Sequence, residues 1–124
     1  MINNYRRKVE LKDDMYIRTS YGKIDKILEL NDSYVKGVSQ KDDFYVYDID
    51  NITKASYNII DILEEGDIIS LYEDIDNYKK QYVIGIPDLI TLDKIKDKIT
   101  NDNIRLVSIL TKEQMEQMAY KVGK

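Results

Sequence analysis

The apolar residues of this chain come in short runs, and clusters of turn-forming residues separate one run from the next. One of the longest runs, Tyr82–Ile86, has only the length of a β-strand. No run approaches the roughly 20 residues that a membrane-spanning helix needs. Short runs bounded by Gly, Asn, Asp and Ser are typical of strands. The sequence therefore predicts a β-rich fold.

Several of these runs alternate apolar and polar residues, which is the period of a strand with one buried face. In the second predicted strand, Ile24, Leu28 and Leu30 lie on one side, on which Lys26 is the exception. The tight turns between the runs predict antiparallel pairing in a meander. The predicted strands are Met15–Thr19, Lys23–Leu30, Tyr34–Val38, Phe44–Ile49, Asp67–Tyr72, Gln81–Ile86 and Ile104–Leu110.

Two segments fit more than one structure. Residues 52–63 are either extended or contain one helical turn that Ser56 caps, and we favour the helical turn. Residues 92–99 have apolar side chains at helical spacing, but their neighbours also alternate well enough for an edge strand. Residues 73–80 are polar and are expected to form the tip of a hairpin.

A helix is predicted at the C-terminal end of the sequence. Thr111 and Gln114 have the spacing of a capping box, in which each side chain binds the other residue's backbone N–H. We expect the apolar stripe of this helix to lie across an open face or end of the sheet. The stripe consists of Met115, Met118, Ala119 and Val122.

The chain shows no repeat, low-complexity tract or flexible linker. Residues 1–14 are polar without a clear period, so they are expected to form an N-terminal extension outside the core. Residues 15–124 are expected to form a single compact β-rich domain. The predicted fold is mainly β (α+β), either a small twisted antiparallel sheet or a partly open SH3-like barrel, with a C-terminal helix.

The composition argues against most catalytic chemistry. The sequence contains neither Cys nor His, so thiolate nucleophiles, cysteine-bound zinc and the usual general base near neutral pH are missing. The five glycines are too scattered for a phosphate-binding loop. We expect no enzyme activity and no cofactor. The lack of Cys suits a reducing interior, and residues 1–14 lack the apolar stretch of a secretion signal, so a cytoplasmic location in a bacterial host cell is expected.

Two carboxylate pairs invite a metal-binding interpretation. Asp48–Asp50 and Asp74–Asp76 each begin like a calcium loop, but neither is followed by the glycine and glutamate that such a loop requires. Lysines at alternate positions in residues 94–98 suggest a phosphate-binding face, but acidic residues interrupt them. The formal net charge of −4 also opposes general affinity for nucleic acid. We therefore expect no metal site, no direct nucleic-acid binding and no membrane binding.

The acidic residues are concentrated in one segment. Between Asp42 and Asp76 there are eleven carboxylates and a single basic residue, Lys54. Tyrosines fall within the same segment, and carboxylates mixed with rigid amphipathic rings are suited to binding a basic groove on a protein. The predicted partner-binding residues are Asp48, Asp50, Glu64, Glu65, Asp67, Glu73, Asp74, Asp76, Tyr45, Tyr47 and Tyr72.

Three stretches resemble a family of small uncharacterised phage and prophage proteins of low-GC Gram-positive bacteria. These stretches are Met15–Gly22 (MYIRTSYG), Ile52–Asp67 (ITKASYNIIDILEEGD) and Ser108–Glu116 (SILTKEQME). Members of that family typically begin at a Met-Tyr pair corresponding to Met15, which makes residues 1–14 a departure from the family pattern. The resemblance implies a phage context, in which small acidic proteins often inhibit host defence, as anti-CRISPR proteins do. It brings no known active site.

These observations lead to one preferred function and two alternatives. The preferred hypothesis is a non-enzymatic phage accessory protein that binds and inhibits a host defence complex, such as a CRISPR effector or another nucleic-acid-handling complex, through its acidic surface. One alternative is a small-ligand sponge that sequesters a nucleotide immune signal with Lys79, Lys80, Arg105 and tyrosine rings. The other is a metal-dependent hydrolase.

Overall fold

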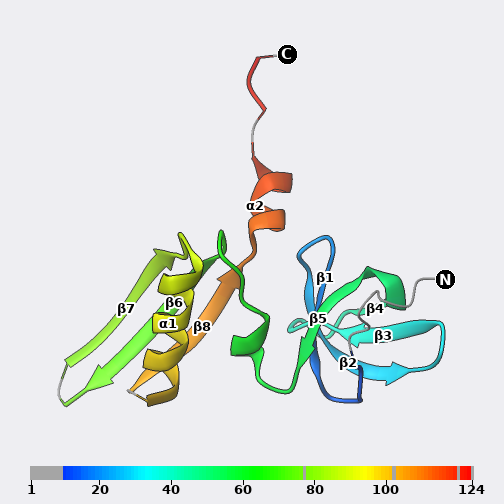
Figure 1. Cartoon of the computed structure of the whole chain (residues 1–124), viewed down its shortest axis with the longest axis horizontal. Helices are drawn as coiled ribbons and strands as arrows, with labels where there is room; N and C mark the ends of the chain where they lie inside the picture. Colours follow the sequence, from blue (N-terminus) through cyan, green and yellow to red (C-terminus); the bar gives the residue numbers. More distant parts are fainter. Residues whose placement is uncertain (1–9, 77, 102, 120, 124) are drawn as a thin grey trace. The chain divides into compact units, whose positions relative to one another are not determined.

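The computed structural model describes residues 10–76, 78–101, 103–119 and 121–123. The contacts group the chain into two compact units, Met1–Ile62 and Leu63–Lys124, where the sequence led us to expect one. Each unit has its own antiparallel sheet (Figure 1). The predicted fold class is confirmed, because the chain is mainly β and carries a C-terminal helix.

The first unit contains a sheet whose two edge strands are consecutive in the chain. The strand order is β4-β3-β2-β1-β5, and only a short 3-10 turn, η2 (Ile49–Asn51), connects β4 with β5. Such a short connection between opposite edges requires the sheet to curl, and the sheet stays open because β4 and β5 do not pair. The strands are β1 (Tyr16–Thr19), β2 (Ile24–Leu30), β3 (Tyr34–Val38), β4 (Phe44–Asp48) and β5 (Ile52–Ser56).

Every strand of this sheet contributes one side chain to a common core. Leu11 also packs against this core, although we expected residues 1–14 to lie outside it. The backbone N–H of Asp14 donates to the carbonyl of Ile27 on β2. This hydrogen bond holds the segment that precedes β1 against the sheet. Residues 1–9 lie outside the described residues. The core residues are Ile17, Ile27, Val35, Tyr47 and Ile52.

The apolar side of β2 that Ile24, Leu28 and Leu30 share in the sequence does not face the core along the whole strand. Asp25 and Ile27 are buried, whereas Leu28 is 47% exposed. The pairing between β2 and β3 shifts register between Ile27 and Glu29, so the alternation does not continue through the strand. A register shift moves each later side chain to the other face, which explains why Leu30 is again partly buried.

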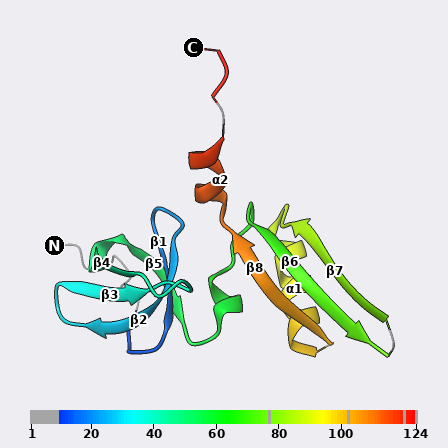
Figure 2. The same ribbon diagram turned by 180° about the vertical axis from the view of Figure 1, so that it is seen from behind.

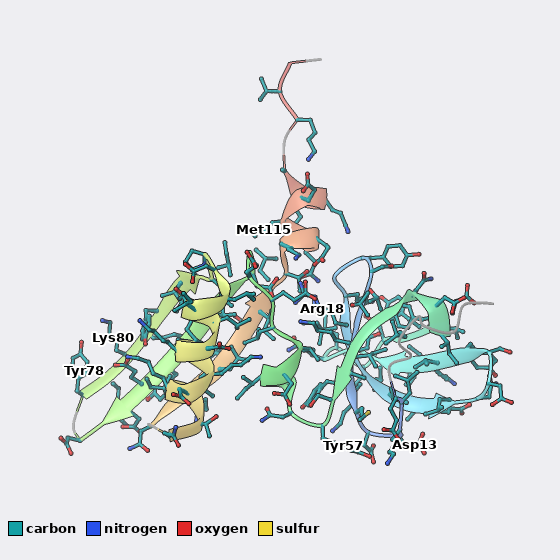
Figure 3. The ribbon with its side chains drawn as sticks, viewed as in Figure 1. Asp13, Arg18, Tyr57, Tyr78, Lys80 and Met115 are labelled. Atoms are coloured by element: carbon teal, nitrogen blue, oxygen red, sulfur yellow. The ribbon has the colours of Figure 1, made fainter. Side chains whose placement is uncertain are left out.

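Residues 52–63 contain both of the structures that the sequence allowed. The first part is strand β5, and the favoured helical turn follows as the 3-10 turn η3 (Ile59–Ile62). The Ser56 hydroxyl accepts a hydrogen bond from the Asn58 N–H and donates one to the Asp61 carboxylate, at 3.0 and 2.8 Å. Arg18 on β1, labelled in Figure 3, donates from its guanidinium to the Ile62 carbonyl at 3.0 Å and so anchors η3 to the sheet.

The second unit contains a three-stranded sheet of order β7-β6-β8. Strands β6 (Ile68–Ile75) and β7 (Tyr78–Gly85) pair as far as Ile75 and Tyr78, so most of the predicted polar tip is strand. The ambiguous residues 92–99 are helical and belong to α1 (Leu89–Asn101). This helix connects β7 with β8 (Ile104–Leu110) at the opposite edge of the sheet.

Helix α1 covers one face of this sheet. Leu92 and Ile95 of the helix are buried, as are Ile69, Leu71 and Ile104 on the strands. Pairing and alternation place these three strand residues on the same face. Figure 2 shows the sheet from its opposite side, with α1 behind the strands. The second unit therefore has its own small two-layer core.

The C-terminal helix α2 (Lys112–Met118) begins as predicted. The Gln114 N–H donates to the Thr111 hydroxyl at 3.3 Å, and the Thr111 N–H donates to the Gln114 side-chain oxygen at 3.0 Å. The helix ends after two turns because Ala119 is extended. Its predicted stripe does not cover the sheet as expected, since Met118 is 72% exposed and Val122, beyond the helix, is 81% exposed.

Candidate protein-binding edge

Strand β4 is an edge strand that exposes three large apolar side chains in succession. Phe44, Tyr45 and Val46 are 59%, 41% and 64% exposed. No described strand pairs with the side of β4 that faces away from β3. Proteins usually shorten, twist or charge such edges because an open edge can pair with another chain. An apolar open edge is therefore a candidate binding surface.

The pairing with β3 determines which backbone groups of β4 point outward. The Ser39 N–H donates to the Asp43 carbonyl, and the Ile49 N–H donates to the Ser33 carbonyl, at 2.9 and 3.3 Å. In an antiparallel ladder every second residue bonds to the neighbouring strand, and the residues between direct their N–H and C=O groups away. By this alternation and the observed register, the outward groups belong to Phe44, Val46 and Asp48. These outward groups recur at every second residue, which is the spacing that pairing with another strand requires.

The aromatic rings of β4 lie on both faces of the strand. Tyr47 points into the core, where its hydroxyl donates to Asp25 at 2.6 Å. Tyr45 shares that face, and the Lys23 ammonium lies 3.0 Å from the centre of its ring. Phe44 and Val46 alternate onto the opposite face. The edge thus offers apolar surface on either side of its backbone.

Exposed carboxylates flank β4 at both ends. The hydroxyl of Ser39 accepts hydrogen bonds from the N–H groups of Lys41 and Asp43, and this tight turn places Asp42 and Asp43 immediately before the strand. At the other end, the Asp48 side chain makes no capping hydrogen bond to η2. We call residues 42–50, with the four exposed carboxylates of Asp42, Asp43, Asp48 and Asp50, the β4 edge.

The β4 edge contains part of the predicted partner-binding set. Asp48, Asp50 and Tyr45 lie on it and are exposed. Tyr47 is buried, so its assignment to a binding surface was wrong. Phe44 was missed, as were Val46, Asp42 and Asp43. A signal was available in the sequence, because pairs of aspartates flank an alternating apolar run at both ends.

The assignment of Asp67 to a binding surface was also wrong. This residue is fully buried in the second unit. Its carboxylate accepts hydrogen bonds from the backbone N–H of Glu64 at 2.8 Å and that of Lys112 at 3.0 Å. Glu64 pairs with the Lys112 ammonium at 2.9 Å. The two acidic residues thus connect the segment before β6 to the start of α2, whereas Glu65 is exposed.

The remaining predicted acids lie on the β6–β7 hairpin. Glu73 is directly opposite Lys80, and Asp74 is directly opposite Lys79. Asp76 lies in the connecting turn with a positive φ of 52°. Opposite charges across a strand pair attract each other. The acidic segment is therefore divided between two units, and three of its six acids in the second unit, Glu64, Glu73 and Asp74, are paired with a lysine or lie directly opposite one.

Tyr82 gives this hairpin a measurable pH dependence. The pKa of Tyr82 is raised from 10.0 to about 12. Burial is the larger cause, and the second is the hydrogen bond that its hydroxyl donates to Glu73 at 2.7 Å. The folded state therefore holds this proton more tightly than the unfolded state, and the corresponding stability is lost as the pH rises from about 10 to about 12. We expect Glu73→Gln to lower the pKa in a titration of tyrosinate absorbance.

The matched control for this titration is Glu65→Gln, which changes an exposed carboxylate of the same unit. It should leave the Tyr82 step in place, and Tyr82→Phe should remove that step. If Glu73→Gln and Glu65→Gln gave the same curve, the hydrogen bond to Glu73 would not be responsible for the shift in pKa.

The other face of the three-stranded sheet carries a shallow pocket of about 340 Å³. The Arg105 guanidinium lies 4.8 Å from the centre of the Tyr72 ring, which forms part of the lining. The lining also includes Asp74, whose carboxylate opposes the binding of phosphate. The two lysines predicted to hold this ligand, Lys79 and Lys80, are adjacent on β7. Their side chains therefore point to opposite faces of the sheet. The pocket residues are Tyr72, Asp74, Asn103, Ile104 and Arg105.

Two further observations concern the described residues as a whole. They contain no group of three or more carboxylates arranged to hold a metal ion. None of their helices is both long enough and apolar enough to cross a bilayer. Comparisons of the chain with protein-family models, with curated proteins and with solved structures found no match.

Proposed function

We propose that this chain is a non-enzymatic phage accessory protein that binds and inhibits a host defence complex, such as a CRISPR effector, and that the β4 edge is its binding surface. The observation that carries the proposal is an exposed apolar edge strand with two carboxylates at each end. The resemblance to phage proteins supplies the biological context. The proposed location is the cytoplasm of the bacterial host.

The chemistry of the β4 edge favours a protein partner over nucleic acid. Four carboxylates repel phosphates. Covering Phe44 and Val46 with another apolar surface, by contrast, lowers the free energy of the complex. Complexes that handle nucleic acid carry basic surfaces where phosphates bind. An acidic edge can occupy such a surface, and long-range attraction accelerates the encounter. Inhibition by occupancy requires a surface of this kind and no catalytic residue.

Charge reversal tests the surface directly. Replacing Asp48 and Asp50 by lysine should weaken binding to a purified, guide-loaded CRISPR effector by at least about tenfold at low salt, a loss of about 1.4 kcal/mol. The reason is that two attractive charges become repulsive. Isothermal calorimetry at low and high salt measures the change, and the difference should shrink as salt screens the charges.

The control makes the same change of charge in the second unit. Asp93 and Asp97 are exposed residues of α1, so replacing both by lysine alters the net charge equally but leaves the β4 edge intact. Affinity for the effector should stay within about threefold of the original, since only long-range attraction changes. Equal losses in the two double variants would contradict the proposed surface, and so would no loss in either.

The pocket beside Tyr72 supports the nucleotide sponge as a second candidate. An aromatic ring next to a guanidinium can hold a base and a phosphate, and the pocket volume of about 340 Å³ would admit a small ligand. Its open form and the carboxylate of Asp74 make it the weaker candidate. A thermal-shift screen with cyclic nucleotides separates the two functions, because an inhibitor acting through β4 would show no stabilisation.

A further inference from the structure

We infer that the β4 edge accepts a short extended segment of its partner as a sixth strand of the curled sheet, and that this segment is apolar in its middle and carries arginine or lysine at both ends. The inference rests on the proposed function and states how the same surface recognises its partner. It follows from the outward backbone groups, the side chains beside them and the charges at the two ends.

The backbone of β4 supplies a ready ladder. Phe44, Val46 and Asp48 direct N–H and C=O groups away from β3, at every second position of the strand. An extended peptide of about five residues can pair with all three, since both chains rise equally per residue. Main-chain hydrogen bonds of this kind provide affinity in strand addition, and the side chains provide specificity.

The side chains of the edge define the chemistry of the added strand. Its central residues would lie beside Phe44 and Val46 on one face and Tyr45 on the other, so apolar residues fit there. The ends of the strand would meet Asp42 and Asp43 at one end and the carboxylates that follow Tyr47 at the other. Basic residues at those positions would be attracted, and acidic residues would be repelled.

The same charges disfavour a second copy of this chain as the occupant. If two β4 strands paired with each other, the carboxylates at the ends of one would face carboxylates of the other, whether the strands ran parallel or antiparallel. Like charges placed opposite each other destabilise a strand pair. Charged residues at open edges commonly prevent such self-association. The charges of the β4 edge therefore disfavour pairing with a second copy of β4 and favour pairing with a basic strand.

A proline substitution tests the backbone component. The Val46 N–H points outward, so Val46→Pro removes a donor that β3 does not use, and proline is tolerated at such edge positions. Val46→Ala removes more of the side chain than proline does but keeps the donor, so it sets an upper limit on what lost side-chain contact alone can cost. Effector affinity should fall at least about tenfold further in Val46→Pro than in Val46→Ala, since a hydrogen bond and its alignment are lost. Circular dichroism confirms that both variants are folded.

Synthetic peptides test the chemistry of the strand without the effector. The probe is the capped heptapeptide Lys-Arg-Val-Tyr-Val-Arg-Lys, titrated into the full chain labelled with nitrogen-15. The amide signals of Phe44, Val46 and Asp48 in the labelled chain should shift when the peptide binds. A control peptide with glutamate at all four basic positions should cause no shift. Two further versions carry N-methyl groups at the odd or at the even positions, and only one of the two should still bind, because one set of amides faces β4.

Several results would overturn the inference. These are equal binding by both N-methylated peptides, shifts centred away from β4, and a dimer formed through this edge in sedimentation. The experiments also distinguish strand addition from the proposed function. If the double lysine variant lost the effector but Val46→Pro matched Val46→Ala, the inhibitor proposal would stand and strand addition would fail. If the heptapeptide bound as described but the effector did not bind, only the inhibitor proposal would fail.

Discussion

Replacing Gly37 by alanine should lower the free energy of unfolding of the first unit by about 3 kcal/mol. Gly37 on β3 lies against a buried polar pair, in which Tyr47 donates to Asp25 at 2.6 Å. A Cβ atom at position 37 would stand 2.9 Å from the Asp25 Cβ, 3.0 Å from its Oδ2 and 3.3 Å from the Tyr47 ring. Contacts this short force the pair apart, and a separated buried hydroxyl and carboxylate lose their hydrogen bond.

The chain contains a matched control for this substitution. Gly85 also lies in a strand, but a Cβ atom there would meet nothing within 4 Å. Gly85→Ala should therefore be neutral or stabilise the second unit by up to about 1 kcal/mol, because alanine loses less backbone entropy on folding. Urea unfolding followed by circular dichroism compares the two variants. If Gly37→Ala were as mild as Gly85→Ala, the close packing around Asp25 would have no energetic importance.

Asp67→Ala should destabilise the second unit by a similar amount, about 3 kcal/mol. The Asp67 carboxylate accepts two backbone hydrogen bonds, one from Glu64 and one from Lys112, and it is fully buried. Hydrogen bonds to a charged group contribute about 1.5–3 kcal/mol each, and alanine leaves both N–H groups without this acceptor. Asp67→Asn keeps one oxygen acceptor, so its free energy of unfolding should lie between that of the original chain and that of Asp67→Ala. Unfolding in urea gives the free energies.

The control for Asp67 is its exposed neighbour Glu65. Glu65→Ala removes the same charge from the same segment without removing a buried acceptor, so its effect should lie within about 0.5 kcal/mol. A result in which Asp67→Ala and Glu65→Ala are equally mild would contradict the structural role of Asp67. A large loss for Asp67→Ala alone would confirm that this carboxylate belongs to the framework and not to a binding surface.

Local sequence patterns predicted the elements of this fold better than their burial. The capping box at Thr111 and the 3-10 turn after Ser56 depend on residues within a few positions of each other, and both were identified. The exposure of Leu28 could not be predicted, because it depends on a register shift between two strands. Residues 92–99 became helical because α1 connects two strands that flank β6, and that topology is not local.

The candidate site was predicted only in part for a related reason. A carboxylate has the same appearance in a sequence whether it binds a partner or a backbone N–H. The Lys112 N–H that binds Asp67 lies 45 residues away along the chain, and 22 residues separate Tyr47 from its partner Asp25. Charge clustering singled out Asp48 and Asp50, which are exposed, but gave no reason to separate them from the buried Asp67. The open side of β4 became visible only once the strand order was known.

The strand order of the first unit also determines the sequence of events when that unit folds. Strands β1 to β4 pair with their neighbours along the chain, whereas β5 pairs with β1, so that Tyr16 meets Ser56. The hairpins can form early because their loops are short, but the last pairing must close a long loop before it gains any contact. Until residue 56 has left the ribosome, the nascent sheet lacks its fifth strand, and one side of β1 has no strand to pair with.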